Sequence, residues 1–512
     1  MLWIHRYTGF GLSLLFLFWF LSGFVMMYKD FPYLSRTEAL ERAESVPSPS
    51  TWVTPRELSL KHDLPPEGWE SIKVVALGGR PVYSLQDKAG KFYCFFADDG
   101  EKVPPISETE VRSIISRFTG SEATIASVEE MSELDQWTPR TRFLPYLPAY
   151  RVHLNDDKGT VCYVSSVTGE VFQKLNTADK IWAWLGAIPH WIYFKDLRIR
   201  TQLWRDVVVA LSIVGTVMCA AGLYLGIIRV RRKKQRQWAF SPYKKVWFKW
   251  HHYTGFAFGL FTFTWILSGL FSMNPWKWSP STSLNEQART TWQGGVLTPS
   301  LFTLSPHQAL VALENINPKI SELVLTQFAG KPYYQLRMAD GSHQLLLGDR
   351  IYPPLDRLDT KAYVRQVQAI HPETIYPEAK DLRVTELMDY DAYYYDKHRT
   401  RPLPVLKVDL NDKTNTTYYI DPSTTEVLMK YETTSRVNRW VYHGLHSLDF
   451  PALFFRRPLW DLVVITLMLG GISVSVTGLM LTWKWGKRKI LGKVAIKGNR
   501  RYPEASSQRV SQ

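Results

Sequence analysis

The stretch Trp3-Ile-His-Arg-Tyr-Thr-Gly-Phe10 opens the chain, and most of it returns as Trp250-His-His-Tyr-Thr-Gly-Phe256. Each copy leads into an apolar run without Asp, Glu, Lys or Arg, and two more such runs occur elsewhere. The four uncharged runs are residues 8–28, 207–228, 253–273 and 462–483. A helix of about 20 residues crosses a hydrocarbon core of about 30 Å, whereas buried core helices usually have about 10–14 apolar residues. The sequence therefore predicts four transmembrane helices.

The repeat extends beyond the opening stretch. Nine residues in and just before the first run recur at one constant offset. His5, Tyr7, Thr8, Gly9, Phe10, Trp19, Leu21, Ser22 and Gly23 match His251, Tyr253, Thr254, Gly255, Phe256, Trp265, Leu267, Ser268 and Gly269. At an offset of 256, Trp184, His190, Trp204, Gly222 and Leu223 match Trp440, His446, Trp460, Gly478 and Leu479. We therefore predict two duplicated halves.

The positive charge is concentrated beside the predicted helices. The chain has a formal net charge of +15, and residues 229–249 contain nine Lys or Arg and no acidic residue. By the positive-inside rule, both termini and this linker are cytoplasmic, and the two long regions between helices lie outside. Charge beside membrane segments does not resemble the basic face of a nucleic-acid-binding domain, so no nucleic-acid partner is expected. The first run exceeds the usual 7–15 residues of a signal-peptide core and is interpreted as a retained anchor.

These assignments divide the chain into eight segments. The expected order is residues 1–28, the first transmembrane helix; 29–176, a first periplasmic region; 177–228, an amphipathic helix and the second transmembrane helix; 229–250, a basic cytoplasmic linker; 251–273, the third transmembrane helix; 274–433, a second periplasmic region; 434–483, an amphipathic helix and the fourth transmembrane helix; and 484–512, a basic cytoplasmic tail.

The two long regions have a strand-rich pattern. Alternating β-branched and aromatic residues are broken by turn sequences such as Asn-Asp and Thr-Gly, which is typical of short antiparallel hairpins. Residues 79–85 parallel 330–336, and residues 148–155 parallel 404–411; short helical patterns cover 108–118 and 305–315. Each half is thus expected to carry two helix-plus-hairpin modules of the α+β class.

Several motifs together resemble a known family. They are the two His-x-Tyr-Thr-Gly-Phe stretches, Thr168-Gly-Glu-Val171, Asp421-Pro-Ser-Thr-Thr-Glu-Val427, Asp391-Ala-Tyr-Tyr-Tyr395 with His398, and Leu403-Pro-Val405. From Trp3 to about Trp485 the chain resembles the PepSY-associated transmembrane proteins. Some members of that family are inner-membrane ferric-siderophore reductases with two b-type haems. The resemblance implies PepSY-like modules, a bacterial inner-membrane location and an oxidoreductase activity.

Four histidines point to the same cofactor from the residues themselves. Of twelve histidines, His5, His190, His251 and His446 correspond between the halves and flank the predicted helices. A low-spin b-type haem takes two imidazoles as its axial ligands. We predict one haem between His5 and His251 at the cytoplasmic side and a second between His190 and His446 at the outer side.

Two neighbouring histidines are alternative ligands. His252 is adjacent to His251, and His443 is close to His446. The repeat favours His251 and His446, because Arg6 and Ala187 stand at the positions that correspond to the alternatives. A single histidine at a membrane edge is usually only a polar anchor.

A tyrosine-rich cluster in the second half is a tentative acceptor site. It comprises Asp391, Tyr393, Tyr394, Tyr395 and His398, where the first half has Asp135-Gln-Trp137 and no equivalent histidine. In a duplicated protein, positions that differ between the halves are candidates for function. The alternative interpretation is a tyrosine-rich strand edge packed on its neighbour.

The absence of several motifs limits how haem is attached and which molecule donates electrons. The sequence has no Cys-x-x-Cys-His motif, dinucleotide fingerprint or Walker motif, so the haem is expected to be non-covalent and the electron donor to be a quinol or a separate cytoplasmic flavoprotein. The predicted function is transfer of electrons to a periplasmic acceptor such as a ferric siderophore. The alternative is a non-redox module that is anchored in membrane lipid and binds or inhibits a periplasmic peptidase or envelope partner. Whether Cys94 and Cys162 form a disulfide stays open.

Overall fold

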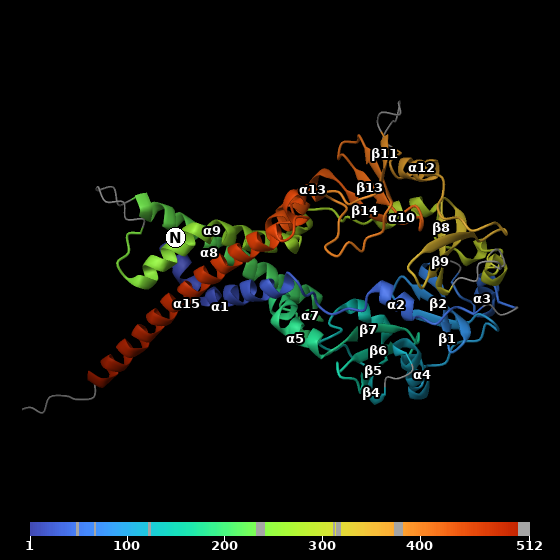
Figure 1. Ribbon diagram of the computed structural model, residues 1–512, viewed down its shortest axis with the longest axis horizontal. Helices are drawn as coiled ribbons and strands as arrows, with labels where there is room; N and C mark the ends of the chain where they lie inside the picture. Colours follow the sequence, from blue (N-terminus) through green and yellow to red (C-terminus); the bar gives the residue numbers. More distant parts are fainter. Residues whose placement is uncertain are drawn as a thin grey trace, which may run out of the picture.

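The computed structural model describes residues 1–47, 51–65, 68–120, 124–231, 241–310, 313, 319–372 and 382–499. A bundle of long helices occupies one end of the molecule, and a strand-rich region occupies the other (Figure 1). Residues 232–240 of the predicted basic linker and residues 500–512 of the predicted tail lie outside the described residues.

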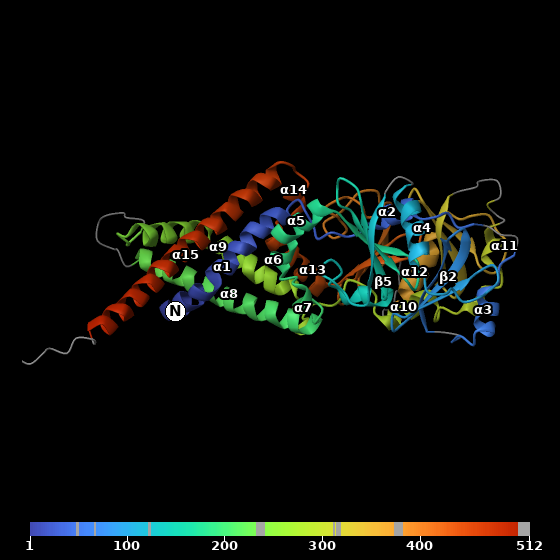
Figure 2. The same ribbon diagram turned by 90° about the horizontal axis from the view of Figure 1, so that it is seen from below.

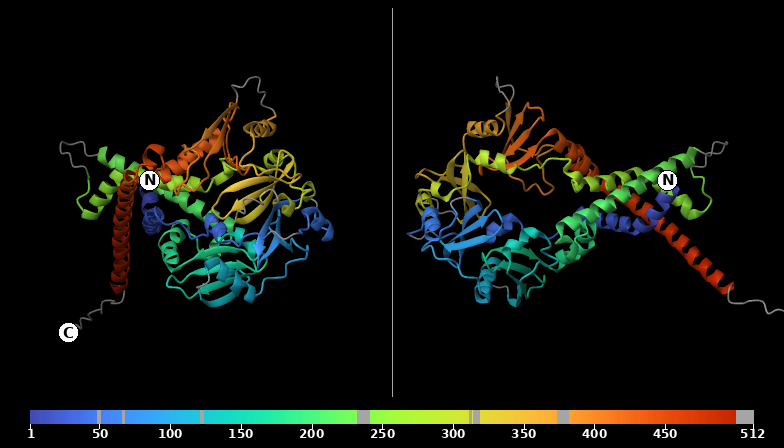
Figure 3. Two further views of the ribbon diagram at one scale, coloured as in Figure 1. Left: turned by 45° about the vertical axis from the view of Figure 1, so that its right-hand side comes forward. Right: turned by 180° about the vertical axis from the view of Figure 1, so that it is seen from behind.

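Four helices in the described part of the chain are long and apolar enough to cross a membrane. They are α1 (Leu2–Met26), α8 (Thr201–Arg231), α9 (Val246–Ser272) and α15 (Leu459–Asn499). Helix α1 packs against α8 and α15, and α9 packs against the same two helices, so α1 and α9 occupy opposite corners of the bundle (Figure 2). Large apolar side chains such as Leu14, Phe18 and Leu462 are exposed, as expected where helices face lipid. Helix α15 extends well beyond the other three (Figure 3).

A six-stranded antiparallel sheet lies farthest from the bundle and joins strands from both ends of the chain (Figure 1). Its order is β10 (His343–Leu347), β9 (Lys331–Met338), β8 (Ile320–Phe328), β1 (Trp69–Leu77), β2 (Arg80–Asp87) and β3 (Phe92–Phe96). Strands β1 and β8 pair through Ile72 and Leu325, Lys73 and Val324, and Val74 and Leu323. The expected first modules of the two halves are therefore one shared sheet. Pairing removes two edge strands that would otherwise expose unpaired backbone groups.

Two four-stranded antiparallel sheets lie between this sheet and the bundle. One contains β4 (Ile125–Met131), β5 (Ala149–Leu154), β6 (Val161–Ser165) and β7 (Val171–Leu175); the other contains β11 (Leu382–Leu387), β12 (Val405–Leu410), β13 (Thr417–Ile420) and β14 (Val427–Tyr431). Each packs on one half of the six-stranded sheet. Val82 and Cys94 share a core with Val152, and Leu345 shares a core with Leu406 and Val408.

Helices cover these sheets where the sequence pattern places them. Helix α4 (Glu108–Thr119) begins with a Ser107 and Glu110 capping box and buries Val111, Ile115 and Phe118. Other short helices of this region are α2 (Arg36–Arg42), α3 (Pro55–Lys61), α10 (Glu286–Gln293), α11 (Pro306–Leu310) and α12 (Thr360–Ile370), with 3-10 turns η1 (Thr141–Tyr146), η2 (Pro275–Lys277) and η3 (Pro299–Leu301). The helix expected at 305–315 is described only as α11, because much of its remainder lies outside the described residues.

Short helices connect the sheets to the bundle. They are α5 (Thr177–Leu185), α6 (Ala187–Trp191) and α7 (Lys195–Arg198) before α8, and α13 (Thr433–Arg439), the π-helix η6 (Trp440–Gly444) and α14 (Pro451–Phe454) before α15. The apolar pattern through Ile188 predicts one continuous amphipathic helix, but Gly186 divides it into α5 and α6. Cys94 and Cys162 are buried in one core and unpaired.

Candidate functional site

The structure brings together the two members of each predicted histidine pair. His5 on α1 faces His251 on α9, with ring centroids 6.1 Å apart; we call these residues the first pair. His190 on α6 faces His446, just after η6, with ring centroids 6.0 Å apart; these are the second pair. The alternative His252 lies with its Nε2 atom 3.4 Å from the carbonyl oxygen of Gly226 on α8.

The spacing of both pairs suits two axial ligands of one metal ion. An imidazole nitrogen binds a first-row metal at about 2.0–2.1 Å, which puts the centroids of two opposed rings about 6.3 Å apart. Each observed separation is within a few tenths of an ångström of that value. A b-type haem takes two such opposed imidazoles.

In the second pair, each ring is fixed through its Nδ1 atom. His190 Nδ1 lies 3.1 Å from the carbonyl oxygen of Trp19 and 3.2 Å from the hydroxyl of Ser22. His446 Nδ1 lies 3.3 Å from the carbonyl oxygen of Trp265 and 3.1 Å from the hydroxyl of Ser268. A carbonyl oxygen only accepts, so each Nδ1 carries the proton and each Nε2 keeps its lone pair for a ligand bond.

The first pair is fixed in the same way by the other two long helices. His5 Nδ1 lies 3.1 Å from the carbonyl oxygen of Met218 on α8, and His251 Nδ1 lies 3.0 Å from the hydroxyl of Thr477 on α15. The Thr477 hydroxyl donates its own proton to the carbonyl of Ser473, so its oxygen accepts from His251. Metal-binding histidines characteristically donate their second ring nitrogen to such an acceptor.

A glycine lies beside each of the four rings. A Cβ atom at Gly222 would lie 2.6 Å from Cε1 of His5, and one at Gly23 would lie 3.2 Å from Cε1 of His190. The corresponding distances are 3.6 Å at Gly478 for His251 and 3.7 Å at Gly269 for His446. Gly222 therefore has no room for a larger side chain, Gly23 is tight, and the other two sites tolerate one more easily. The sequence repeat contains all four glycines, but it gave no reason to assign them to the rings.

The first pair opens onto a cavity of about 700 Å³ between the four long helices. Its size falls within the range of about 300–1,000 Å³ that is usual for cofactor and ligand sites. Arg6, Arg229 and Arg488 line it together with both histidines. Cationic groups at the rim of an apolar cavity favour a ligand that carries acidic groups.

Two buried indole groups lack a hydrogen-bond acceptor. Nε1 of Trp19 and Nε1 of Trp265 have no partner among the described residues, although the backbone carbonyls of both tryptophans hold the second pair. A buried donor without a partner is uncommon and fits the neighbourhood of a bound group. Burial also lowers the pKa of His190 and of His446 to about 4, so both imidazoles are neutral near pH 7, the form that binds metals.

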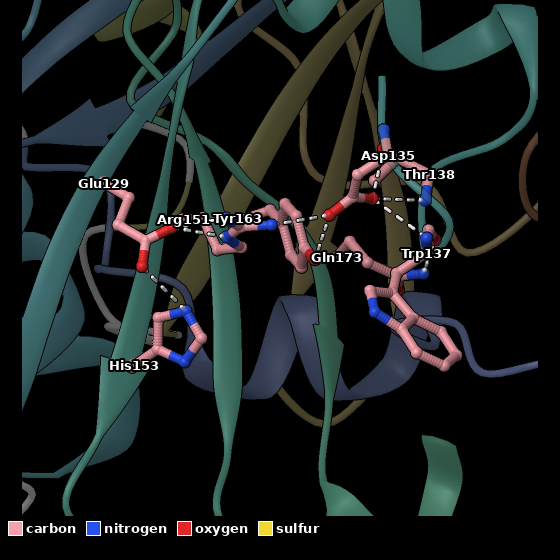
Figure 4. A network of polar contacts seen from close by, with 8 residues as sticks. All are labelled: Glu129, Asp135, Trp137, Thr138, Arg151, His153, Tyr163 and Gln173. Atoms are coloured by element: carbon pink, nitrogen blue, oxygen red, sulfur yellow. Dashed lines mark hydrogen bonds and ion pairs between the residues drawn. The ribbon is translucent and has the colours of Figure 1, made fainter. Parts of the chain in front are cut away.

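Most of the predicted acceptor cluster has a structural role that both halves share. Asp391 accepts hydrogen bonds from the Tyr419 hydroxyl at 2.8 Å and from Lys407 at 3.1 Å. In the same way, Asp135 accepts from the Tyr163 hydroxyl at 2.7 Å and from Arg151 at 3.3 Å (Figure 4). Each aspartate ties a loop to its four-stranded sheet.

The other members of the cluster lie around Asp391 and between the sheet and the bundle. Tyr393 and Tyr394 donate their backbone N–H groups to Asp391, and the fully buried ring of Tyr394 stacks on Tyr419. The Tyr393 hydroxyl accepts from Trp440 of η6 at 3.2 Å, and Tyr395 and His398 also make contacts toward the bundle. Tyr395 donates to Asp449, and His398 Nε2 lies 3.0 Å from Asp30, just after α1.

Comparison with known families identifies the family of the chain. The family described as the PepSY-associated TM region matches residues 2–309, more than half of the chain. The chain belongs to the PepSY-associated transmembrane family. The resemblance seen in the motifs is thereby confirmed, and the chain is a membrane protein. No curated protein matches it. Within the described part of the chain, no group of three or more His, Cys, Asp or Glu residues is placed to hold a metal ion, and a haem needs only two protein ligands.

Proposed function

We propose that this PepSY-associated protein is a bacterial inner-membrane electron-transfer protein that binds two b-type haems and reduces a periplasmic ferric siderophore. The observation that carries the proposal is the pair of opposed imidazole couples, each with ring centroids about 6 Å apart and each Nδ1 held by a neighbouring group. At each site, one proposed ligand comes from the first half of the chain and the other from the second half. The proposed ligands are His5 with His251 and His190 with His446.

The positions of the two pairs support transfer across a membrane. His5 lies near the beginning of α1, and Ser22, which contacts His190, lies near its end. Seventeen residues separate them, or about 25 Å of helix, most of a hydrocarbon core. The positive-inside rule puts the first pair at the cytoplasmic side and the sheets in the periplasm.

The residues of the chain prepare both sites for a cofactor. The imidazoles are held through Nδ1 and present Nε2 to the site, the glycines leave room beside the rings, and the arginines of the first cavity would pair with the acidic groups of a haem. Haem bound at each pair would supply reversible one-electron transfer. Electrons would enter from a quinol or a cytoplasmic flavoprotein. Iron reduced to the ferrous state binds hard oxygen ligands less tightly and leaves a siderophore more easily.

Stopped-flow spectroscopy tests this function. The full-length protein is purified in detergent, reduced without oxygen and mixed with a ferric hydroxamate siderophore. We expect the haem absorption to return to its oxidised form, and the same siderophore loaded with gallium, which accepts no electron, to leave it reduced. His190→Ala should lose this rapid reoxidation. A haem-loaded wild-type protein that is not reoxidised would refute the proposed activity and leave haem binding intact.

A further inference from the structure

The surroundings of the second pair differ between the two halves. Beside His190, the small residues Ala183 and Ala187 and the aromatic Tyr193 share one apolar core. At the offset of 256, these three positions are occupied by Arg439, His443 and Asp449. The second half therefore places a polar cluster where the first half has apolar packing.

The Asp449 carboxylate is the centre of this cluster. Arg439, only 3% exposed, lies with Nη1 3.3 Å from Asp449 Oδ1 and donates through Nη2 to the Asp449 carbonyl at 2.8 Å. The other carboxylate oxygen, Oδ2, accepts a hydrogen bond from the Tyr395 hydroxyl. His443 Nδ1 lies 3.9 Å from the same Oδ2. Three potential metal-binding atoms thus meet at one side of the carboxylate.

We propose that Tyr395 Oη, Asp449 Oδ2 and His443 Nδ1 form a binding site for a ferric ion beside the second histidine pair. Phenolate and carboxylate oxygens are hard ligands that suit a highly charged cation, and imidazole is a common iron ligand. With bonds of about 2.0–2.1 Å, two ligand atoms on nearly opposite sides of a first-row ion lie about 4 Å apart. The distance of 3.9 Å between His443 Nδ1 and Asp449 Oδ2 matches this span.

The contacts of the carboxylate determine how an ion would be bound. Arg439 contacts Oδ1, which orients the carboxylate, while Oδ2 accepts from the Tyr395 hydroxyl and would bind an ion once that phenol loses its proton. On binding, the Tyr395 phenol would release its proton to water, as ligands of metal ions generally do. The side chain of His443 is 47% exposed and that of Asp449 only 6%, so a chelator would reach the ion from the His443 side and complete the coordination with its oxygens. Among the described residues, no three His, Cys, Asp or Glu side chains are placed to hold a metal ion by themselves, so this site depends on the phenol oxygen.

The site is close to the second pair. The ring of Tyr442 lies 4.3 Å from that of His443 and 5.7 Å from that of His446, centroid to centroid. The π-helix η6, which carries Tyr442 and His443, is a rare conformation that occurs mostly at functional sites. The electron source rests on the proposed function, whereas metal binding does not. The ferric ion would take one electron from the reduced centre at the second pair, which returns to its oxidised state, and Tyr395 would regain a proton from water as the ferrous ion leaves.

Titration with gallium tests the site, because this ion resembles ferric iron and is not reduced. The full-length protein in detergent is titrated with the gallium nitrilotriacetate complex, and binding is followed by the ultraviolet difference spectrum of tyrosinate and by metal analysis. We expect one equivalent with a tyrosinate signal. Tyr395→Phe should abolish the signal, and His443→Ala should weaken binding by about 10- to 100-fold.

Two controls keep the outcome interpretable. Tyr393→Phe changes a tyrosine of the same loop and should bind gallium like the wild type. Asp449→Asn is less suitable, because it leaves the buried Arg439 without its counter-ion and weakens the fold. Equal binding by all variants, or a wild-type protein without a tyrosinate signal, would overturn the site. Absence of haem from a wild-type protein that binds gallium would instead overturn the proposed function alone.

Discussion

The two histidine pairs have nearly the same geometry but are supported differently. In the first pair, both rings project from long apolar helices into a cavity of about 700 Å³, and Gly222 leaves no room for a Cβ beside His5. In the second pair, both rings come from short segments outside the long helices and are held by hydroxyl and carbonyl groups of α1 and α9. Both pairs are held through their Nδ1 atoms, but the first pair also borders the cavity and the close Gly222, whereas each ring of the second pair has both a hydroxyl and a carbonyl beside Nδ1.

Removing a ligand should have the largest effect. His251→Ala takes away one of the two proposed axial ligands of the first pair, so we expect the loss of about one of the two proposed haems. Haem content per chain, measured as the pyridine complex, gives the result. His252→Ala is the matched control and should keep both haems, since His252 does not face His5. If His252→Ala lost a haem and His251→Ala did not, the ligand assignment would be wrong.

Filling the space beside a ring should have the next largest effect, and it should be unequal between two glycines. Gly222→Ala places a methyl group 2.6 Å from Cε1 of His5, so the ring must move and the first haem should bind weakly or be lost. Gly478→Ala brings its methyl group only to 3.6 Å from Cε1 of His251 and should retain haem. Haem content and the absorption of the oxidised protein measure both variants. Equal behaviour would show that the first pair does not depend on space.

Removing one hydroxyl should have the smallest effect and should be confined to the second pair. Ser22→Ala leaves the Trp19 carbonyl as the remaining acceptor for His190, so the cost is that of one hydrogen bond, about 1 kcal/mol. Haem should be retained but released to apomyoglobin about fivefold faster at one site. Ser268→Ala should act alike on His446. Complete loss of haem in either variant would mean that the hydroxyl, and not the carbonyl, holds the ring.

The sequence predicts the four long helices and the pairing of the four histidines. Uncharged runs predict the four long helices, and the offset between repeats pairs His5 with His251 and His190 with His446. The anchors of the rings were not predicted, although Trp19, Ser22 and Gly23 all belong to the repeat. A repeat indicates that residues correspond between halves, but it does not indicate which distant side chain each one contacts.

Two other features depend on contacts that lie far apart in the sequence. The pairing of β1 with β8 joins strands about 250 residues apart, and no local pattern indicates it. The Asp391 cluster looked specific to the second half because its neighbours along the chain differ from those of Asp135. Its partners Tyr419 and Lys407 correspond to Tyr163 and Arg151, which only the folded chain brings to the aspartates.

The most direct test of the central claim is the haem stoichiometry and spin state of the purified full-length protein. We predict two b-type haems per chain, both low-spin and six-coordinate in the oxidised and reduced forms, with no binding of carbon monoxide to the reduced protein. A chain without haem, or with high-spin haem that binds carbon monoxide at both sites, would contradict the two opposed histidine pairs.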